Sequence, residues 1–151
     1  EMCIRDSTND AASTVTRLVD MGVEPFLISS SLAGVLGQRL IRRVCKNCKT
    51  LYTPTDDDLE RLNLTREEIG DRKFCYGKGC PTCNYTGYKG RKALTELLVV
   101  NGDIRELISD NAPTSAIRDK AREQGMRTLR EDGLAAIFNH ESSVDEVVRY
   151  T

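Results

Sequence analysis

Aromatic residues are scarce in this chain. Among its 151 residues there is no tryptophan, and phenylalanine and tyrosine together make up 5%. The 39% of hydrophobic residues must therefore fill the core mainly with aliphatic side chains, in one medium domain or two small ones. The sequence also lacks a long apolar run and any stretch that resembles a signal peptide, while 30% of its residues are charged. We therefore expect a soluble protein of the cytoplasm, where disulfides are rare.

An excess of positive charge is absent as well. The 22 lysines and arginines are balanced by 23 aspartates and glutamates, which gives a formal net charge of −1. Proteins that bind nucleic acid over a broad surface neutralise many phosphates, so this balance argues against such a surface. The charges are uneven along the chain, with a basic cluster (Arg39, Arg42, Arg43, Lys46, Lys49) and an acidic one (Asp56, Asp57, Asp58, Glu60, Glu67, Glu68, Asp71).

Four cysteines in two matched pairs are the strongest motif. Cys45 and Cys48 form the first pair, Cys80 and Cys83 the second, and 31 residues separate the pairs. Two Cys-x-x-Cys turns can close a tetrahedral thiolate cage around Zn²⁺. A closed cage has no open position for water or substrate, so the metal would be structural. Two alternatives are a pair of disulfides, which predict an exported chain, and a redox dithiol, which needs only one pair.

Three further residues, of types that can bind metals, do not fit this pattern. Cys3 stands alone, and Cys75 lies five residues before Cys80, where it competes as a ligand but is better interpreted as a free thiol near the site. The single histidine, His140, lies in a stretch typical of a helix end. We assign it no chemical role.

The first half of the chain indicates helices followed by a strand. Residues 8–22 have the pattern of an amphipathic helix that Thr8 or Asn9 caps. The serines at 29–31 predict the start of a second helix through Leu32, Val35, Leu36 and Leu40, with residues 39–44 leaving it as a strand. Residues 91–100 predict another strand, which we expect to pair antiparallel with 39–44. The cysteine module, residues 45–90, then sits at the tip of a hairpin.

Short helices are predicted within the module and a helical region after it. Residues 56–62 read as one peripheral helix, and Thr65 to Glu68 form a capping box that opens another. From residue 101 the pattern is helical to the end, including capping boxes at Thr128 and Ser143. We expect four helices to pack as one compact C-terminal bundle.

Several motifs in order resemble one family. They are Thr8-Asn9-Asp10-Ala11-Ala12, Ser29-Ser30-Ser31-Leu32, Gln38-Arg39-Leu40, the two cysteine pairs, Gly87-Tyr88-Lys89-Gly90-Arg91, Glu96-Leu97-Leu98 and Asp132-Gly133-Leu134. Over residues 8–151 the chain resembles the C-terminal part of a type II secretion or type IV pilus assembly ATPase. The resemblance implies an α/β fragment: the trailing part of a RecA-like ATPase core (8–44 and 91–100), an inserted four-cysteine zinc module (45–90) and a helical subdomain (101–151).

The resemblance also implies cofactors, partners and a location. Family members form homo-hexamers on the cytoplasmic face of the inner membrane, where they use ATP and Mg²⁺ and work through an inner-membrane platform protein and a cytoplasmic-anchor protein. Thr8, Asn9, Asp10 and Arg39 are then expected near a nucleotide or a subunit boundary. The alternative is that they are polar caps and a surface arginine.

The sequence departs from the family in what precedes these motifs. It has no Gly-x-x-x-x-Gly-Lys-Ser/Thr phosphate loop and no acidic Mg²⁺-site segment. Ser7 stands where family members usually have a histidine, and we interpret residues 1–7 as non-native. The chain alone is therefore expected not to hydrolyse ATP.

The competing hypothesis is a zinc-ribbon module that binds nucleic acid or protein through the basic residues near Cys45 and nearby tyrosines, although the negative net charge argues against nucleic acid. A third hypothesis, a free-standing hydrolase, is disfavoured because the sequence shows no nucleophile paired with a base.

Overall fold

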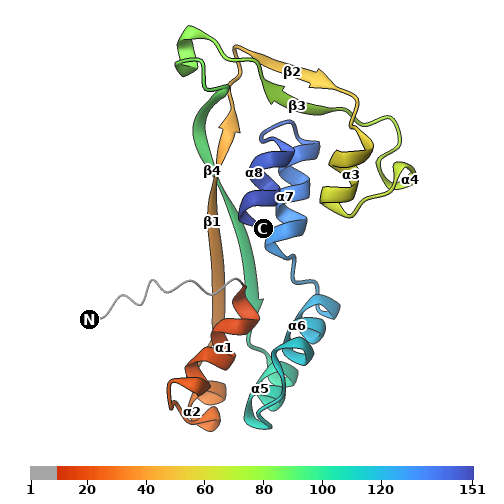
Figure 1. Ribbon diagram of the computed structural model, residues 1–151. Helices are drawn as coiled ribbons and strands as arrows, with labels where there is room; N and C mark the ends of the chain where they lie inside the picture. Colours follow the sequence, from red (N-terminus) through yellow and green to blue (C-terminus); the bar gives the residue numbers. More distant parts are fainter. Residues whose placement is uncertain (1–9) are drawn as a thin grey trace. The chain divides into compact units, whose positions relative to one another are not determined.

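The computed structural model describes residues 10–151 as a mixed α/β chain that divides into two compact units (Figure 1). The first unit comprises residues 10–38 and 95–129, and the second comprises 39–94 and 130–151. The described residues form two two-stranded sheets, β1 with β4 and β2 with β3. The expectation of mixed α/β structure is confirmed.

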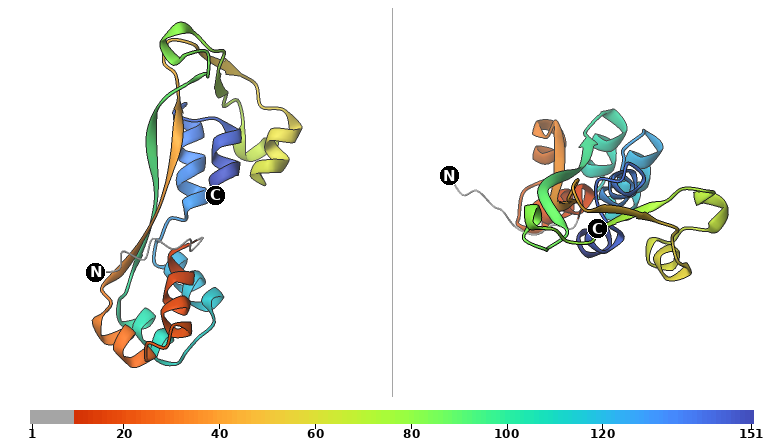
Figure 2. Two further views of the ribbon diagram at one scale, coloured as in Figure 1. Left: turned by 60° about the vertical axis from the view of Figure 1, so that its left-hand side comes forward. Right: turned by 90° about the horizontal axis from the view of Figure 1, so that it is seen from above.

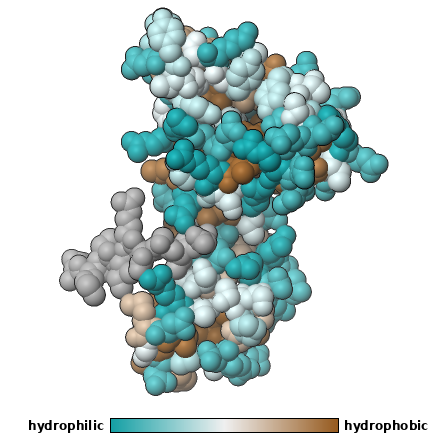
Figure 3. Space-filling view, in the orientation of Figure 1, coloured by the Kyte–Doolittle hydropathy of each residue, from teal (hydrophilic) through white to brown (hydrophobic). Residues whose placement is uncertain are grey.

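Four helices and parts of two strands make up the first unit. They are α1 (Ala11–Asp20), α2 (Pro25–Ser31), α5 (Gly102–Ser109), α6 (Thr114–Glu123), the first residues of β1 (Gly34–Val44) and the last residues of β4 (Tyr88–Val99). Their core is aliphatic, as the composition predicts: Ala11, Ala12, Val15, Ile28, Leu98, Val100, Ile104, Ile108, Ile117 and Ala121 are buried together. Figure 3 shows hydrophobic side chains at the surface of this unit, and Phe26 and Leu27 of α2 are 73% and 53% exposed.

The second unit combines the cysteine pairs with a small sheet and four helices. Its elements are β2 (Lys49–Tyr52), α3 (Asp56–Leu62), α4 (Arg66–Ile69), β3 (Phe74–Gly77), the 3₁₀ turn η1 (Pro81–Cys83), α7 (Leu129–Phe138) and α8 (Val144–Tyr150). Phe74 is fully buried, with its ring 6.3 Å from that of Phe138. Gly133 allows α7 to pack closely against α8, because a Cβ at this position would lie 2.6 Å from Val147 Cγ1.

Strands β1 and β4 pair along their length, in agreement with the predicted hairpin (Figures 1 and 2). Near one end the Val100 N–H donates to the Ala33 carbonyl at 3.0 Å. At the other end the Cys45 N–H donates to the Gly87 carbonyl at 2.9 Å. Contacts that run in opposite sequence directions make the pair antiparallel, and the four cysteines follow β1 or precede β4.

The helix predicted through Leu32, Val35, Leu36 and Leu40 is wrong. Helix α2 ends at Ser31, and the serines lie in its last turn, where Ser29 Oγ donates to the Phe26 carbonyl at 3.0 Å. The following residues form β1, in which Leu36 and Leu40 are exposed and alternate with half-buried or buried positions. The apolar residues therefore follow the period of two of a strand, and two glycines within this stretch disfavour a helix.

The four C-terminal helices do not form a single bundle. Helices α5 and α6 pack with α1 and α2 in the first unit, whereas α7 and α8 belong to the second. Within the first unit, the buried carboxylate of Glu96 on β4 accepts the N–H of Ala11 at 2.7 Å and that of Leu129 at 3.1 Å. The compact units therefore follow different boundaries from the predicted parts 8–44, 45–90, 91–100 and 101–151.

The short helices of the acidic segment form as predicted. Thr55 caps α3 and Thr65 caps α4, each in a reciprocal capping box with the residue three positions on. These helices are not merely peripheral, because Leu59, Leu62 and Ile69 are buried and α3 packs against α8. Within residues 10–151, no helix is both long and apolar enough to cross a membrane.

Candidate metal centre

Two tight turns bring the four predicted cysteines together. In the first turn, directly after β1, the Cys48 N–H donates to the Cys45 carbonyl at 3.3 Å. In the second turn, which contains η1, the N–H groups of Cys83 and Tyr85 donate to the Cys80 carbonyl at 3.1 and 2.9 Å. Asn47 of the first turn also donates to Thr82 Oγ1 of the second at 3.1 Å. The two turns therefore face each other with their sulfur atoms between them.

The sulfur positions fit a tetrahedral metal. All four Sγ atoms lie within 4.8 Å of one another. The pairs Cys45–Cys80, Cys48–Cys83 and Cys80–Cys83 are 3.9, 3.8 and 3.7 Å apart. Four sulfurs at a Zn–S distance of about 2.3 Å occupy tetrahedral corners roughly 3.8 Å apart. The same distances exclude a disulfide between these atoms, because a disulfide requires about 2.05 Å.

The electrostatics of the cluster favour a cation. Burial raises the pKa of the Cys83 thiol, but N–H donors from Cys80 and Gly87 and the thiols of Cys80 and Cys48 outweigh burial and lower it to about 6. Burial and the neighbouring sulfurs raise the pKa of Cys48 to about 12, against an N–H donor from Gly79. The Cys83 sulfur is thus anionic at neutral pH, whereas Cys48 holds its proton. A divalent cation would replace that proton, since a metal ligand must be a thiolate.

Backbone N–H groups support the sulfurs at close range. The N–H groups of Cys80 and Gly87 both donate to Cys83 Sγ at 3.3 Å. Gly87 has φ +78°, and a Cβ there would lie 2.5 Å from the Gly77 carbonyl oxygen. The N–H of residue 87 can therefore reach the sulfur only when this residue is glycine. Such outer contacts orient metal ligands and stabilise their negative charge.

Of the three residues set apart from the cysteine pairs, Cys3 lies outside the described residues, and Cys75 and His140 have structural roles. Cys75 is buried and donates to the Ser142 carbonyl at 3.5 Å, outside the group of four. Burial raises its pKa, so it stays a neutral thiol at neutral pH. His140 has φ +54°, with its Nε2 2.8 Å from the Lys73 carbonyl oxygen. The histidine is half-buried and anchored to the segment before β3.

Two of the four residues expected near a nucleotide or subunit boundary are described by the structure: Asp10 belongs to the first unit and Arg39 to the second. Thr8 and Asn9 lie outside the described residues. Asp10, not Thr8 or Asn9, caps α1: its carboxylate accepts the Ser13 N–H at 2.7 Å and pairs with Arg118. Burial raises the Asp10 pKa, but these contacts outweigh it and hold the pKa below its usual 3.8. Arg39 is half-buried on β1, in the second unit.

Comparison with known proteins identifies the family. The model for the type II/IV secretion system protein family matches residues 7–149. The chain belongs to this family. It is 49% identical over 144 residues to the type IV pilus assembly ATPase PilB of Thermus thermophilus, which covers 95% of this chain and 16% of that relative. It is 44% identical to the type II secretion system protein HxcR of Pseudomonas aeruginosa and 43% identical to the type II secretion system ATPase E of Vibrio cholerae.

The match confirms the resemblance found in the motifs and also defines its extent. Each of these alignments covers 95% of this secretion-family chain, but only 27% of HxcR and 28% of the Vibrio protein. The chain thus spans less than a third of the length of these relatives. The activity, cofactors and partners of a whole secretion-family protein are considered below as proposals.

Sequence reasoning missed one buried network in this secretion-family chain. The pattern from Ser143 to Glu146 was interpreted as a capping box, but only the Ser143 half forms. Glu146 instead accepts the Arg42 side chain through Nε at 2.9 Å and the Arg42 N–H at 2.9 Å. The Arg42 guanidinium also lies 4.1 Å over the ring of Tyr88, whose hydroxyl is 2.7 Å from Ser143 Oγ. The long sequence separation of these partners leaves no local signal.

Proposed function

We propose that this chain is the C-terminal part of a cytoplasmic hexameric ATPase that powers type II secretion or type IV pilus assembly. The observation that carries the proposal is the 43–49% identity, over 95% of this chain, to relatives described as ATPases of these two systems. In such a protein the chain supplies a structural zinc module, a helical part and the trailing part of the RecA-like core. The zinc-ribbon hypothesis for nucleic acid receives no support from these relatives.

The proposed cofactor of the chain itself is one zinc ion, bound by Cys45, Cys48, Cys80 and Cys83. Sulfur separations of 3.7–3.9 Å support this assignment. When bound, zinc neutralises the thiolates and joins the two ends of the intervening 31-residue segment. Because four protein ligands complete a tetrahedron, the role is structural, and ligation contributes to the folding free energy of the second unit.

ATP and Mg²⁺ belong to the whole protein in this proposal. The chain carries no phosphate loop, so it does not hydrolyse ATP alone. Thr8, Asn9, Asp10 and Arg39 are placed near the nucleotide or the subunit boundary by family resemblance. The Asp10 carboxylate already binds Ser13 and Arg118. Asp10 would therefore act by fixing the start of α1 behind Thr8 and Asn9.

The partners follow from the same proposal. They are other copies of the chain in a homo-hexamer, an inner-membrane platform protein and a cytoplasmic-anchor protein, which hold the motor at the membrane. Nucleic acid is not an expected partner, since the net charge is −1. Retention on single-stranded or duplex nucleic acid that falls steeply with salt would contradict this part.

A chimaera tests the proposed function directly. Residues 8–151 replace the matching segment of the Thermus thermophilus PilB protein, to which the chain is 49% identical. We expect the purified chimaera to assemble as the parent does and to hydrolyse ATP, whereas residues 8–151 alone do not. A matched chimaera with Cys80→Ser and Cys83→Ser should lose zinc. A correctly assembled, zinc-loaded chimaera without ATP hydrolysis would refute the proposal.

A further inference from the structure

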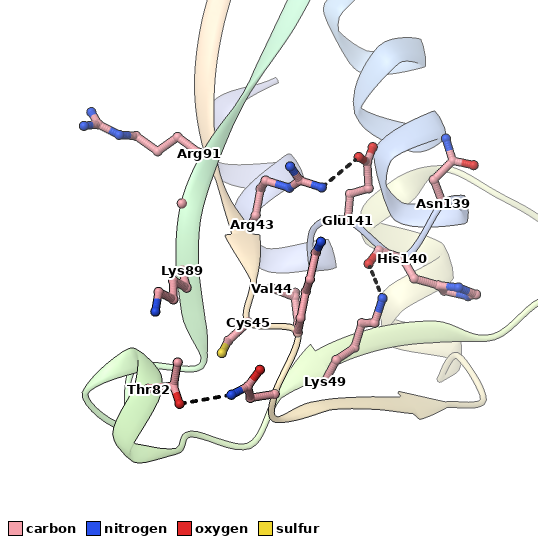
Figure 4. A pocket seen from close by; sticks show the side chains of 13 residues that line it. Arg43, Val44, Cys45, Lys49, Thr82, Lys89, Arg91, Asn139, His140 and Glu141 are labelled. Atoms are coloured by element: carbon pink, nitrogen blue, oxygen red, sulfur yellow. Dashed lines mark hydrogen bonds and ion pairs between the residues drawn. The ribbon is translucent and has the colours of Figure 1, made fainter.

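A basic cavity lies beside the four-cysteine cluster, within the second unit. It has a volume of about 500 Å³ and is lined by the end of β1, the first cysteine turn, Thr82, the start of β4 and the turn after α7 (Figure 4). A volume of this size is typical of sites for small ligands. The zinc proposal does not use the cavity, because the four sulfur atoms face one another and complete their own cage.

The lining is strongly cationic. It contains five cationic side chains, Arg43, Lys46, Lys49, Lys89 and Arg91, and a single carboxylate, Glu141. Seven of the 23 acidic residues of the chain lie in another segment, residues 56–71. The positive potential in the cavity is therefore a local property that the overall charge of −1 conceals.

The one carboxylate is already neutralised. Glu141 pairs with Arg43 at 3.3 Å and also with Lys92, which lies outside the lining. Lys49 donates to the His140 carbonyl at 3.2 Å. Within residues 10–151, no carboxylate forms an ion pair with Lys46, Lys49, Lys89 or Arg91. Four positive charges around one cavity thus have no protein counter-ion in the described part of the chain.

The positions of these groups leave their charges available to a ligand. Figure 4 shows Arg43 and Lys49 turned toward Glu141 and His140, whereas Lys89 and Arg91 extend from β4 away from these residues. All four unpaired side chains are exposed, so they can move onto an anion without breaking an existing ion pair. Bringing an anion among them also relieves their mutual repulsion.

The chemistry of the lining selects among anions. It contains no phenylalanine, tyrosine or tryptophan, and Val44 is its only aliphatic side chain, so it has no platform for a base or an acyl chain. A carboxylate carries one charge on two oxygens, whereas a phosphate group carries about 1.5–2 charges and offers three strong acceptor oxygens. We propose that this cavity binds a small ligand with two or more adjacent phosphate groups.

The test measures binding of inorganic pyrophosphate to the zinc-loaded chain by calorimetry at low ionic strength. Two variants remove two positive charges each from the cavity: Lys46→Gln with Lys89→Gln, and Lys89→Gln with Arg91→Gln. The control, Lys73→Gln with Arg105→Gln, removes the same charge from exposed positions outside the cavity. Zinc content after titration verifies that each chain keeps its metal. Inorganic phosphate, triglutamate and phosphatidylglycerol vesicles are the comparison ligands.

We expect one pyrophosphate per chain, with an affinity about tenfold or more weaker in both cavity variants and within about twofold of the parent in the control. Tighter binding of pyrophosphate than of phosphate or triglutamate supports adjacent phosphates. If the chain also binds the vesicles, and both cavity variants weaken that binding, the phosphate groups belong to a lipid headgroup. If the chain binds pyrophosphate but not vesicles, the ligand is free in solution. The proposal is overturned by no pyrophosphate binding, by equal weakening in the control, by equally tight triglutamate binding, or by vesicle binding without pyrophosphate binding.

Discussion

Replacing Glu146 with alanine should destabilise the second unit strongly for a single substitution. The Glu146 side chain is 2% exposed and accepts three hydrogen bonds from Arg42, through Nε at 2.9 Å, Nη2 at 2.5 Å and the backbone N–H at 2.9 Å. A hydrogen bond to a charged group contributes about 1.5–3 kcal/mol, and the loss of one partner of a buried pair costs about 3–5 kcal/mol. The Arg42 side chain is 49% exposed, so water recovers part of this loss. We expect a loss of about 2–4 kcal/mol.

The assay is urea unfolding of the zinc-loaded chain, followed by circular dichroism and by release of zinc to a coloured chelator, which reports on the second unit. Asp145→Ala is the matched control on the same helix, because Asp145 is 74% exposed and pairs with Arg61 at 2.9 Å. An exposed pair contributes at most about 1 kcal/mol. Equal losses for the two variants would refute the assigned role of the Glu146 network.

The same network predicts a pH dependence. Burial raises the pKa of Glu146, but the side-chain and backbone contacts with Arg42 outweigh burial and lower it below its usual 4.5. A carboxylate whose pKa is lowered in the folded state stabilises the fold at any pH above its usual pKa. This stabilisation is lost as the pH falls through the lowered pKa of the folded state. The stability difference between the parent and Glu146→Gln should therefore be constant from pH 7 to 5 and shrink below about 4.5. A difference that grows on acidification would contradict this assignment.

Three further predictions concern single side chains. Cys75→Ala should leave the zinc content unchanged, whereas Cys80→Ala should abolish tight binding; equal zinc loss would place Cys75 among the ligands. Gly87→Ala should weaken zinc binding at least tenfold in a chelator competition, because φ +78° and the 2.5 Å approach to the Gly77 carbonyl both disfavour a Cβ; unchanged affinity would contradict the close approach. Glu96→Gln should lower the free energy of unfolding in urea by about 1–3 kcal/mol, because an amide nitrogen cannot accept a hydrogen bond from one of the two buried helix N–H groups. An unchanged free energy of unfolding would contradict a stabilising role for this contact.

Local signals made the cysteine site and several elements predictable from sequence. The Cys-x-x-Cys spacing fixes the two turns, and the threonines at 55 and 65 cap their helices through residues three positions away. Such contacts depend on near neighbours along the chain. The helix predicted through Leu36 and Leu40 failed because a sparse apolar pattern fits periods of both 3.6 and 2, and pairing with β4 decided between them.

Long-range contacts explain what the sequence could not predict. Glu96 accepts hydrogen bonds from two backbone N–H groups that lie 85 and 33 positions away in the sequence. Glu146 binds Arg42, 104 positions away, and does not complete the predicted capping box. The sequence shows the basic residues at 43–49 but not the cavity, because Lys89 and Arg91 come from a separate segment about 40 residues further along the chain.

The metal content of the purified chain tests the central claim most directly. Elemental analysis is combined with thiol titration before and after removal of the metal by a strong chelator. The account predicts one zinc per chain and four additional reactive thiols on its removal, from Cys45, Cys48, Cys80 and Cys83. A chain that folds without metal, or whose four cysteines are found in disulfides under reducing conditions of purification, would contradict the structural zinc site.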